Sequence, residues 1–84
     1  MIQIRFEKDK QRSAAYDGDT LAGFCEVQIT DSAWTILHTE VDSAYGGMGI
    51  ARKLVLCVAE QAEREGVKVI PACSYDKKVF TQTE

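Results

Sequence analysis

Residues 42–54 read DSAYGGMGIARKL, and this stretch decides how the rest of the chain is arranged. Three of the six glycines of the chain, Gly46, Gly47 and Gly49, lie almost side by side in it. Glycine reaches backbone conformations that other residues avoid, so a run of glycines between two regular segments indicates a tight turn. The residues before the run alternate in hydropathy, and those after it repeat with a helical period. The stretch therefore joins a strand to a helix through a glycine loop, residues 42–49.

Four strand-like segments with short connections precede the glycine loop. MIQIRF (1–6) alternates in hydropathy, QRSAAY (11–16) is a weaker second segment, and TLAGFCEVQIT (20–30) and WTILHTEV (34–41) follow. Gly18, within the sequence DGD, is typical of a tight hairpin turn between the second and third segments. Consecutive strands with short connections pair as an antiparallel meander.

The segment after the glycine loop changes from the strand period to the helix period. GIARKLVLCVAEQAEREG (49–66) predicts an amphipathic helix that ends at Gly66, and VKVIPA (67–72) predicts a fifth strand. A strand that follows a crossover helix pairs parallel to a strand already in the sheet. YDKKVF (75–80) predicts a short C-terminal helix. The expectation is one α+β domain over residues 1–84 with a mixed sheet: four-strand meander, glycine loop, central helix, parallel fifth strand and short C-terminal helix.

The chain has 84 residues, a mass of 9.3 kDa, a net charge of -3 and a pI of about 5.1. A chain of this length supports a single domain with a small core. The acidic charge argues against nucleic acid as a partner, because phosphate backbones are bound by clustered Lys and Arg. No apolar run approaches the ~20 residues that a membrane span needs. We therefore expect a cytoplasmic protein, monomeric or weakly dimeric, that binds neither nucleic acid nor membrane.

The glycine loop fits one phosphate-binding pattern better than two others. A Walker A loop ends in Gly-Lys-Ser/Thr, which is absent after Gly49, and a dinucleotide fingerprint needs a third glycine where Arg52 stands. The loop that binds the pyrophosphate of acyl-CoA has the form Gln/Arg-x-x-Gly-x-Gly/Ala and opens a helix, and Gly47 and Gly49 supply its two glycine positions. Backbone N–H groups and the positive end of the helix dipole then face the pyrophosphate, with Arg52 and Lys53 nearby. A purely structural turn is the alternative.

The segments HTEVDSAYGGMGIARKL (38–54) and VIPACSYDKKVF (69–80) resemble the GNAT acyltransferase superfamily, in particular its short single-domain branch of small N-acetyltransferase-like proteins. The resemblance implies that the fourth strand carries the pantetheine arm of acetyl-CoA and splays from the fifth strand. Ala44 stands where the superfamily often has Gln or Arg. The resemblance places the backbone contacts to CoA at Val41, Gly46, Gly47, Met48, Gly49, Ile50, Ala51 and Arg52.

His38 and Glu40 are the candidates for a general base on the fourth strand. Strict alternation places both on one strand face, together with Trp34 and Ile36, just ahead of the glycine loop. Transfer of an acyl group to an amine needs a group that removes the proton of the ammonium, and either side chain can do so. The alternatives are a hydrogen-bonded structural histidine and a solvated glutamate at a strand end. The three cysteines and single histidine are far apart, so no metal site or disulfide framework is expected.

Cys73 and Tyr75 follow the fifth strand, at the start of the predicted C-terminal helix. The dipole of a helix capped by Ser74 would lower the pKa of the Cys73 thiol and favour a nucleophilic thiolate. The resemblance implies that Cys73 lies close to the acyl group and that Tyr75 is the general acid for the CoA thiolate. The alternatives are a small buried cysteine and a packed aromatic ring. Direct transfer to the amine and transfer through an acylated Cys73 both remain open.

These observations together predict a small acetyl-CoA-dependent N-acetyltransferase that acts on a primary amine, whose identity the sequence does not give. A CoA-binding module without turnover is the first alternative, and an interaction domain that binds no CoA is the second.

Overall fold

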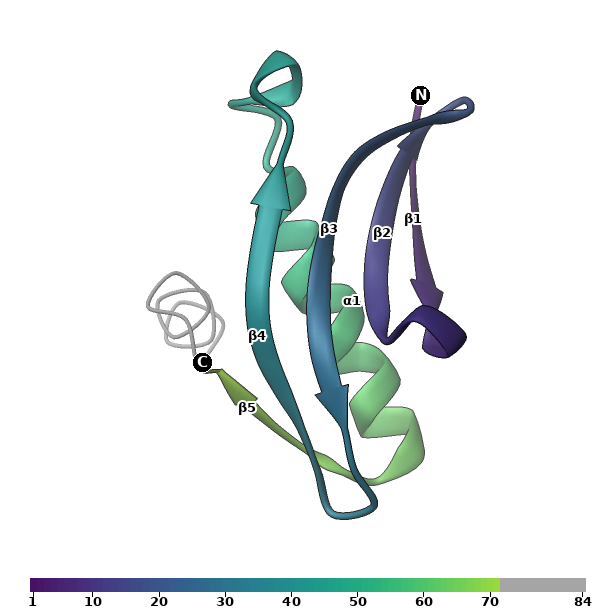
Figure 1. Ribbon diagram of the computed structural model, residues 1–84, viewed down its shortest axis with the longest axis vertical. Helices are drawn as coiled ribbons and strands as arrows, with labels where there is room; N and C mark the ends of the chain where they lie inside the picture. The colour runs from purple at the N-terminus through teal and green to yellow at the C-terminus, as the bar shows by residue number, and fades with distance from the viewer. Residues whose placement is uncertain (72–84) are drawn as a thin grey trace.

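The computed structural model describes residues 1–71. Cys73, Tyr75 and the predicted C-terminal helix lie outside the described residues. Five strands form one sheet in the order β1-β2-β3-β4-β5 (Figure 1). The first four strands pair antiparallel, and β5 pairs parallel to β4, which confirms the predicted α+β fold with a mixed sheet. The strands are β1 (Ile2–Glu7), β2 (Arg12–Asp17), β3 (Thr20–Ile29), β4 (Ala33–Val41) and β5 (Lys68–Pro71).

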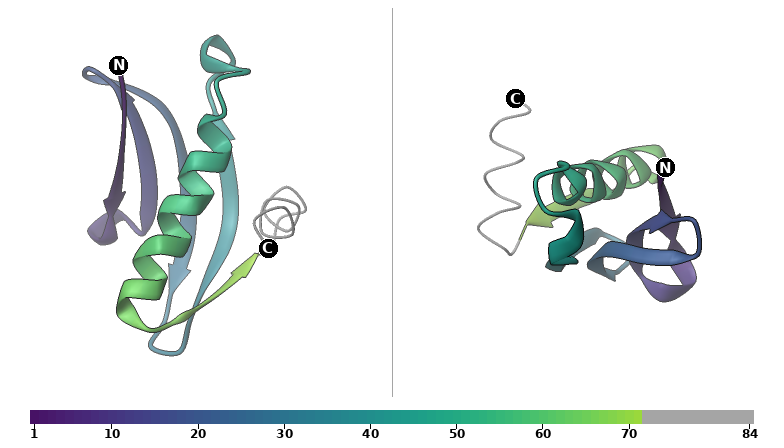
Figure 2. Two further views of the ribbon diagram at one scale, coloured as in Figure 1. Left: turned by 180° about the vertical axis from the view of Figure 1, so that it is seen from behind. Right: turned by 90° about the horizontal axis from the view of Figure 1, so that it is seen from above.

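One long helix, α1 (Ile50–Glu65), connects β4 to β5 and lies across one face of the sheet (Figure 2). It ends at Gly66, which has φ 71°, and whose N–H donates to the carbonyl oxygens of Ala62 and Glu63. A left-handed residue of this kind is the usual way to close a helix, and only glycine adopts it at little cost. Two short 3-10 turns complete the elements within residues 1–71: η1 (Lys8–Lys10) and η2 (Ser43–Tyr45).

The core lies between α1 and the sheet. The Trp34 ring stacks on Phe6 with centroids 5.1 Å apart and planes at 3°. Ser13 is fully buried there, and its hydroxyl donates to the carbonyl oxygen of Leu54 at 2.8 Å, so the one buried polar side chain in the described residues is satisfied. The fully buried apolar residues of the helix and sheet include Ala15, Cys25, Ile36, Leu54, Val55, Val58 and Ala62.

A β-bulge in β4 changes which side chains face α1. Glu26 of β3 pairs with His38, but the next residue of β3, Val27, pairs with Ile36, so Leu37 is an extra residue on β4. Trp34 and Ile36 are therefore buried under the helix, whereas His38 and Glu40 lie on the opposite face. We call that opposite face the outer face. The prediction that His38 and Glu40 share a face is confirmed, and the prediction that Trp34 and Ile36 share it with them is wrong.

The last half of β4 leaves β5. Among the described residues, the β4–β5 pairing ends at Ile36 and Pro71, while β4 continues to Val41. Figure 1 shows β5 turning away from β4 toward its end. The edge of β4 from Leu37 to Val41 therefore has no partner strand on the β5 side among residues 1–71, as the resemblance implied. Within residues 1–71, no helix is long and apolar enough to cross a membrane.

Candidate functional site

The first half of the glycine loop is fixed by local hydrogen bonds. The N–H of Asp42 donates to the carbonyl oxygen of Ala22 at 2.8 Å, which ties the end of β4 to β3. The Asp42 carboxylate accepts the N–H of Ala44 at 2.9 Å, and its carbonyl oxygen accepts the N–H of Tyr45 at 2.9 Å. An aspartate commonly initiates a turn in this way, because its short side chain satisfies the backbone two residues ahead.

The second half of the loop depends on glycine. Gly47 and Gly49 have φ of 80° and 73°, which are left-handed values that a side chain makes costly. A Cβ atom added at either position would find no atom within 4 Å, so backbone conformation, and not lack of space, requires glycine there. Gly46 differs, since it is extended with φ -60° and ψ 147°. Two of the three clustered glycines therefore shape the loop.

The loop and the first turn of α1 present a row of free backbone donors. The N–H groups of residues 47–51 have no acceptor among residues 1–71, and no side chain caps the helix. The first hydrogen bond at the helix start runs from the N–H of Lys53 to the carbonyl oxygen of Gly49 at 3.2 Å. Free N–H groups at a helix N-terminus carry partial positive charge and attract anions.

A cavity of about 280 Å³ lies beside these donors. The side chain of Ile50 is buried in the core, so this residue offers its backbone, whereas Met48, Arg52 and Lys53 are exposed around the loop. The residues that line the cavity are Val41, Tyr45, Gly46, Gly47, Gly49, Ile50 and Ala51.

His38 and Glu40 are two positions apart on β4, and both lie on the outer face, away from the core. The His38 ring meets Phe24 edge-on, with centroids 6.2 Å apart and planes at 62°, and Phe24 is the cross-strand neighbour of Glu40. Neither the His38 ring nor the Glu40 carboxylate has a hydrogen bond or ion pair with another residue described by the structure. The structural alternative for His38, a hydrogen-bonded ring, therefore finds no support in this part of the chain.

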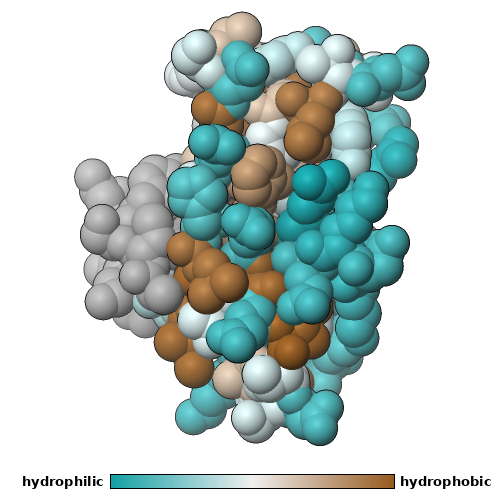
Figure 3. Space-filling view, viewed as in Figure 1, coloured by the Kyte–Doolittle hydropathy of each residue, from teal (hydrophilic) through white to brown (hydrophobic). Residues whose placement is uncertain are grey.

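A second cavity, of about 460 Å³, lies beside the start of β3 and the end of β4. Glu40, Phe24 and Leu21 line it, and Val41 lines both this cavity and the smaller one. Figure 3 shows apolar residues at this upper end of the outer face and a hydrophilic band below them. Gly23 forms part of the wall, and a Cβ atom there would lie 2.8 Å from the carbonyl oxygen of Glu40. The candidate base Glu40 thus borders a hollow on the side away from α1.

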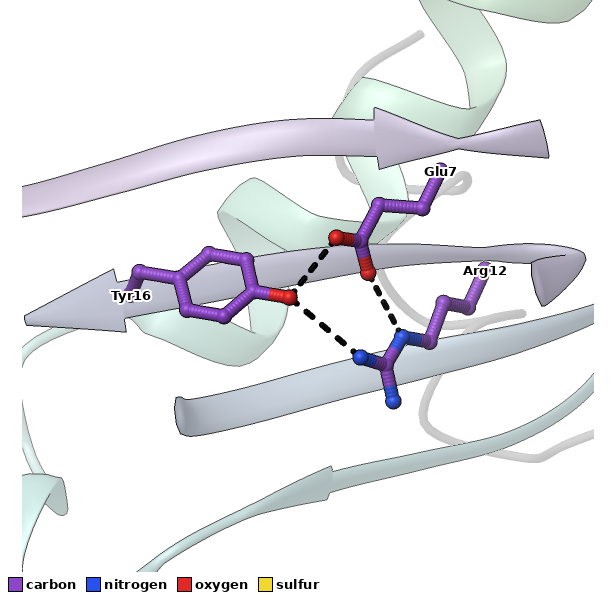
Figure 4. A network of polar contacts seen from close by, with 3 residues as sticks. All are labelled: Glu7, Arg12 and Tyr16. Carbon is purple, nitrogen blue, oxygen red and sulfur yellow. Dashed lines mark hydrogen bonds and ion pairs between the residues drawn. The ribbon is translucent and has the colours of Figure 1, made fainter. Parts of the chain in front are cut away.

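The rest of the outer face holds a polar cluster made of Glu7, Arg12 and Tyr16 (Figure 4). The Tyr16 hydroxyl donates to Glu7 Oε2 at 2.7 Å, and Arg12 Nε donates to Glu7 Oε1 at 2.8 Å. Arg12 Nη2 also donates to the Tyr16 hydroxyl at 3.3 Å, and its guanidinium lies 5.8 Å from the Phe24 ring centroid. The hydrogen bond from Tyr16, followed by that from Arg12, lowers the pKa of Glu7. The three side chains satisfy one another and support Phe24.

The sequence pointed to the loop glycines and to the two candidate bases but missed Gly23 and Tyr45. A glycine within a strand pattern is a signal of close backbone approach, which is what Gly23 allows. Tyr45 was visible only as an aromatic residue within a polar loop. Of the two cysteines described, Cys25 is buried, and burial raises the pKa of the half-buried Cys57 thiol.

Comparison with models of known protein families identifies one match. Residues 7–84 match the profile of the family described as GCN5-related N-acetyl-transferase. No curated protein matches the sequence of this chain.

Three solved structures resemble the fold. The ribosomal-protein-alanine N-acetyltransferase from Brucella melitensis biovar Abortus 2308 has a TM-score of 0.71 at 21% identity, over 92% of this chain and 64% of that one. Glucosamine-6-phosphate N-acetyltransferase from Arabidopsis thaliana has a TM-score of 0.69 at 24% identity, over 86% of this chain and 56% of that one. A protein of unknown function from meticillin-resistant Staphylococcus aureus, described as a probable acetyltransferase, has a TM-score of 0.72 at 14% identity, over 99% and 88%. This chain thus spans less than two thirds of the first two structures.

Proposed function

Because the chain belongs to the GCN5-related N-acetyltransferase family, we propose that it is a small acetyl-CoA-dependent N-acetyltransferase that transfers an acetyl group to a primary amine. The observation that carries the proposal is the row of N–H groups at residues 47–51, which have no acceptor among the described residues and border a cavity at the start of α1. A diphosphate would accept these hydrogen bonds and gain from the helix dipole. Arg52 and Lys53, exposed on the first turn, add positive charge near it.

The edge of β4 that β5 leaves unpaired supports our proposal for where the pantetheine arm binds. Past Ile36 no described residue pairs with β4 on its β5 side, so backbone groups between Leu37 and Val41 are open to an extended ligand. An amide-containing chain that lies along this edge would hydrogen-bond as an added strand does. Val41, which ends the strand and lines the cavity, joins this edge to the proposed pyrophosphate site.

The chemistry that we propose starts on the outer face. Glu40 or His38 takes the proton from the acceptor ammonium, directly or through water. The amine nitrogen then forms a bond to the thioester carbon, the carbon–sulfur bond of acetyl-CoA breaks, and the CoA thiolate leaves with a proton. The cavity beside Glu40 gives the acceptor a way in from the side opposite α1.

Cys73 and Tyr75 complete the proposal from outside the described residues. Tyr75 gives its proton to the CoA thiolate. In the two-step alternative, the Cys73 thiolate attacks the thioester carbon, CoA leaves, and the amine then displaces Cys73 from the acetyl group. Intact-mass measurement after incubation with acetyl-CoA separates the routes, because only the two-step route adds an acetyl group to wild type that Cys73→Ala loses. Full turnover by Cys73→Ala supports direct transfer.

A CoA-binding module without turnover is the second candidate function. The free loop N–H groups and the cavity beside them favour it, since they support binding of a ligand without requiring a catalytic side chain. Binding and turnover are therefore measured separately.

The test of the proposed function starts with urea unfolding in the presence of acetyl-CoA. A ligand at about 100 times its Kd adds about 2.7 kcal/mol to the free energy of unfolding. Release of CoA thiol is then followed with a panel of primary amines, with Glu40→Gln as the variant that removes a candidate base. Stabilisation with turnover supports the enzyme, and stabilisation without turnover supports the binding module. If millimolar acetyl-CoA adds no stability, both are wrong.

A further inference from the structure

We propose that a hydrogen bond between Tyr45 and Asp17 positions the glycine loop, so that both are positioning residues of the proposed acetyl-CoA site. The Tyr45 hydroxyl donates to Asp17 Oδ2 at 2.9 Å, although the two residues are 28 positions apart. Asp17 ends β2 at the hairpin with β3, and Tyr45 lies in η2 after β4. Figure 1 shows this hairpin and the loop at the same end of the sheet. The inference rests on the proposed function.

Tyr45 is one of two side-chain anchors of the loop. On one side of Gly46–Gly49, the half-buried Tyr45 ring packs against the core cluster. On the other side, Ile50 is only 2% exposed and holds the start of α1 in the same core. Between the anchors, the N–H of Gly46 donates to the carbonyl oxygen of Ser43 at 3.2 Å, and the N–H groups of Gly47 to Gly49 have no acceptor within residues 1–71. The path of the free donors is therefore set by where Tyr45 and Ile50 are held.

The two anchors differ in kind. Ile50 is buried in the apolar core, whereas Tyr45 is only half-buried. Packing alone leaves such a ring free to change rotamer, and the hydrogen bond to Asp17 fixes the position of its outer end. The same hydrogen bond raises the pKa of Tyr45 and lowers that of Asp17, which agrees with a phenol that donates to a carboxylate.

Asp17 is itself held in place by the hairpin. Gly18 has φ 60°, and the two-residue turn of Gly18 and Asp19 brings Asp17 opposite Thr20. The amino group of Met1 also contacts Asp17, at 3.3 Å from Oδ1, so the two carboxylate oxygens have separate partners. Tyr45→Phe thus removes one contact only, and it retains the ring that packs on the core.

The experiment compares Tyr45→Phe and Asp17→Ala with the control Asp19→Ala, which removes an exposed carboxylate from the same hairpin. Hydrogen–deuterium exchange in the ligand-free protein reports on the loop without any assumption about function. We expect faster exchange in residues 42–51 for the first two variants, and no change for the control. We also expect CoA to bind about three- to tenfold more weakly by calorimetry, and KM for acetyl-CoA to rise while kcat stays within about twofold.

The possible outcomes separate this inference from the proposed function. Unchanged exchange and unchanged CoA affinity in Tyr45→Phe would overturn the inference while the proposed function stands. Faster exchange with unchanged affinity would also overturn it, because the loop would then bind CoA equally well without the tether. If wild type binds no CoA, the proposed function fails, and the inference fails with it as a statement about the acetyl-CoA site.

Discussion

In the Glu7–Arg12–Tyr16 cluster each polar side chain bonds to the other two, whereas in the glycine loop a row of N–H groups meets no acceptor among the described residues. The cluster lies on a paired part of the sheet, where its polar side chains find their partners among one another and Arg12 also contacts the Phe24 ring. The loop is held at Tyr45 and Ile50 and leaves its donors open between them. Free N–H groups at a helix N-terminus attract anions, so the open donors beside a cavity agree with the proposed pyrophosphate site. Substitutions in the sheet should therefore change stability, and substitutions in the loop should change binding.

The largest expected effect is on stability, at Gly23 in the sheet. In Gly23→Ala the new Cβ atom would lie 2.8 Å from the carbonyl oxygen of Glu40 and 3.2 Å from Val41 atoms. The backbone of β3 or β4 must move, and overpacking of this kind costs about 1–3 kcal/mol. Urea unfolding, followed by the fluorescence of Trp34, measures the change. A loss below about 0.5 kcal/mol, the range of an ordinary surface substitution, would contradict the prediction. It would mean that β3 and β4 can accommodate a Cβ atom at this position without cost.

The second effect is on binding, at Gly47 in the loop. Gly47→Ala meets no neighbouring atom, but it places a side chain at φ 80°, which costs about 1–2 kcal/mol. Relaxation of the loop relieves this cost and misdirects the N–H groups, so CoA affinity should fall about tenfold, or about 1.4 kcal/mol. Gly46→Ala is the matched control, because φ at Gly46 is -60° and suits any residue. Equal affinities for the two variants, measured by calorimetry, would contradict the proposed role of the loop.

A smaller loss of stability is expected in the polar cluster. Tyr16→Phe removes the hydroxyl that donates to Glu7 at 2.7 Å and accepts from Arg12 at 3.3 Å. The free energy of unfolding should fall by about 1 kcal/mol, since a single hydrogen bond contributes about 0.5–1.5 kcal/mol. CoA affinity should stay within about twofold of wild type. A variant of full stability that binds CoA poorly would reverse the assigned roles of the two regions.

The smallest effect concerns pH. The Glu7 carboxyl has a pKa below its ordinary value of 4.5 in the folded protein, mainly because Tyr16 and Arg12 stabilise the charged form. Its contribution to stability is therefore complete above the unfolded pKa and is lost as pH falls through the lower folded value. Unfolding curves between pH 7 and pH 3 should show a shallower fall for Glu7→Gln than for wild type. Parallel curves would mean that Glu7 does not contribute to the acid sensitivity.

Local signals were enough to predict most of the fold. The hairpin glycine Gly18, the loop glycines and the helix end at Gly66 each follow from backbone conformations that other residues avoid. The parallel pairing of β5 follows from the crossover helix. Strand faces were predictable only up to the bulge, because the alternating segment WTILHTEV gives no sign that Leu37 is an extra residue.

The candidate site was only partly predictable, and the reason is distance along the chain. The loop donors come from one continuous stretch, so their spacing could be recognised. The contact of Tyr45 with Asp17 joins residues 28 positions apart, and that of Phe24 with His38 joins β3 to β4. Such pairs depend on the strand register, which no local pattern specifies here. Gly23 belongs to the same class, since its need for glycine arises from the backbone of Glu40 on the neighbouring strand.

The bulge at Leu37 divides β4 into two stretches whose alternate side chains face opposite sides of the sheet. Before it, the side chains that alternate inward belong to the core, and changes there endanger folding. After it, His38 and Glu40 point outward and are released from that constraint, so substitutions there should leave the core unchanged. If Leu37 instead paired as an ordinary strand residue opposite Glu26, the strand would shift by one position, and His38 and Glu40 would turn to the side that packs on α1. Loss of the bulge in this way would therefore harm the candidate bases more than most substitutions of their neighbours.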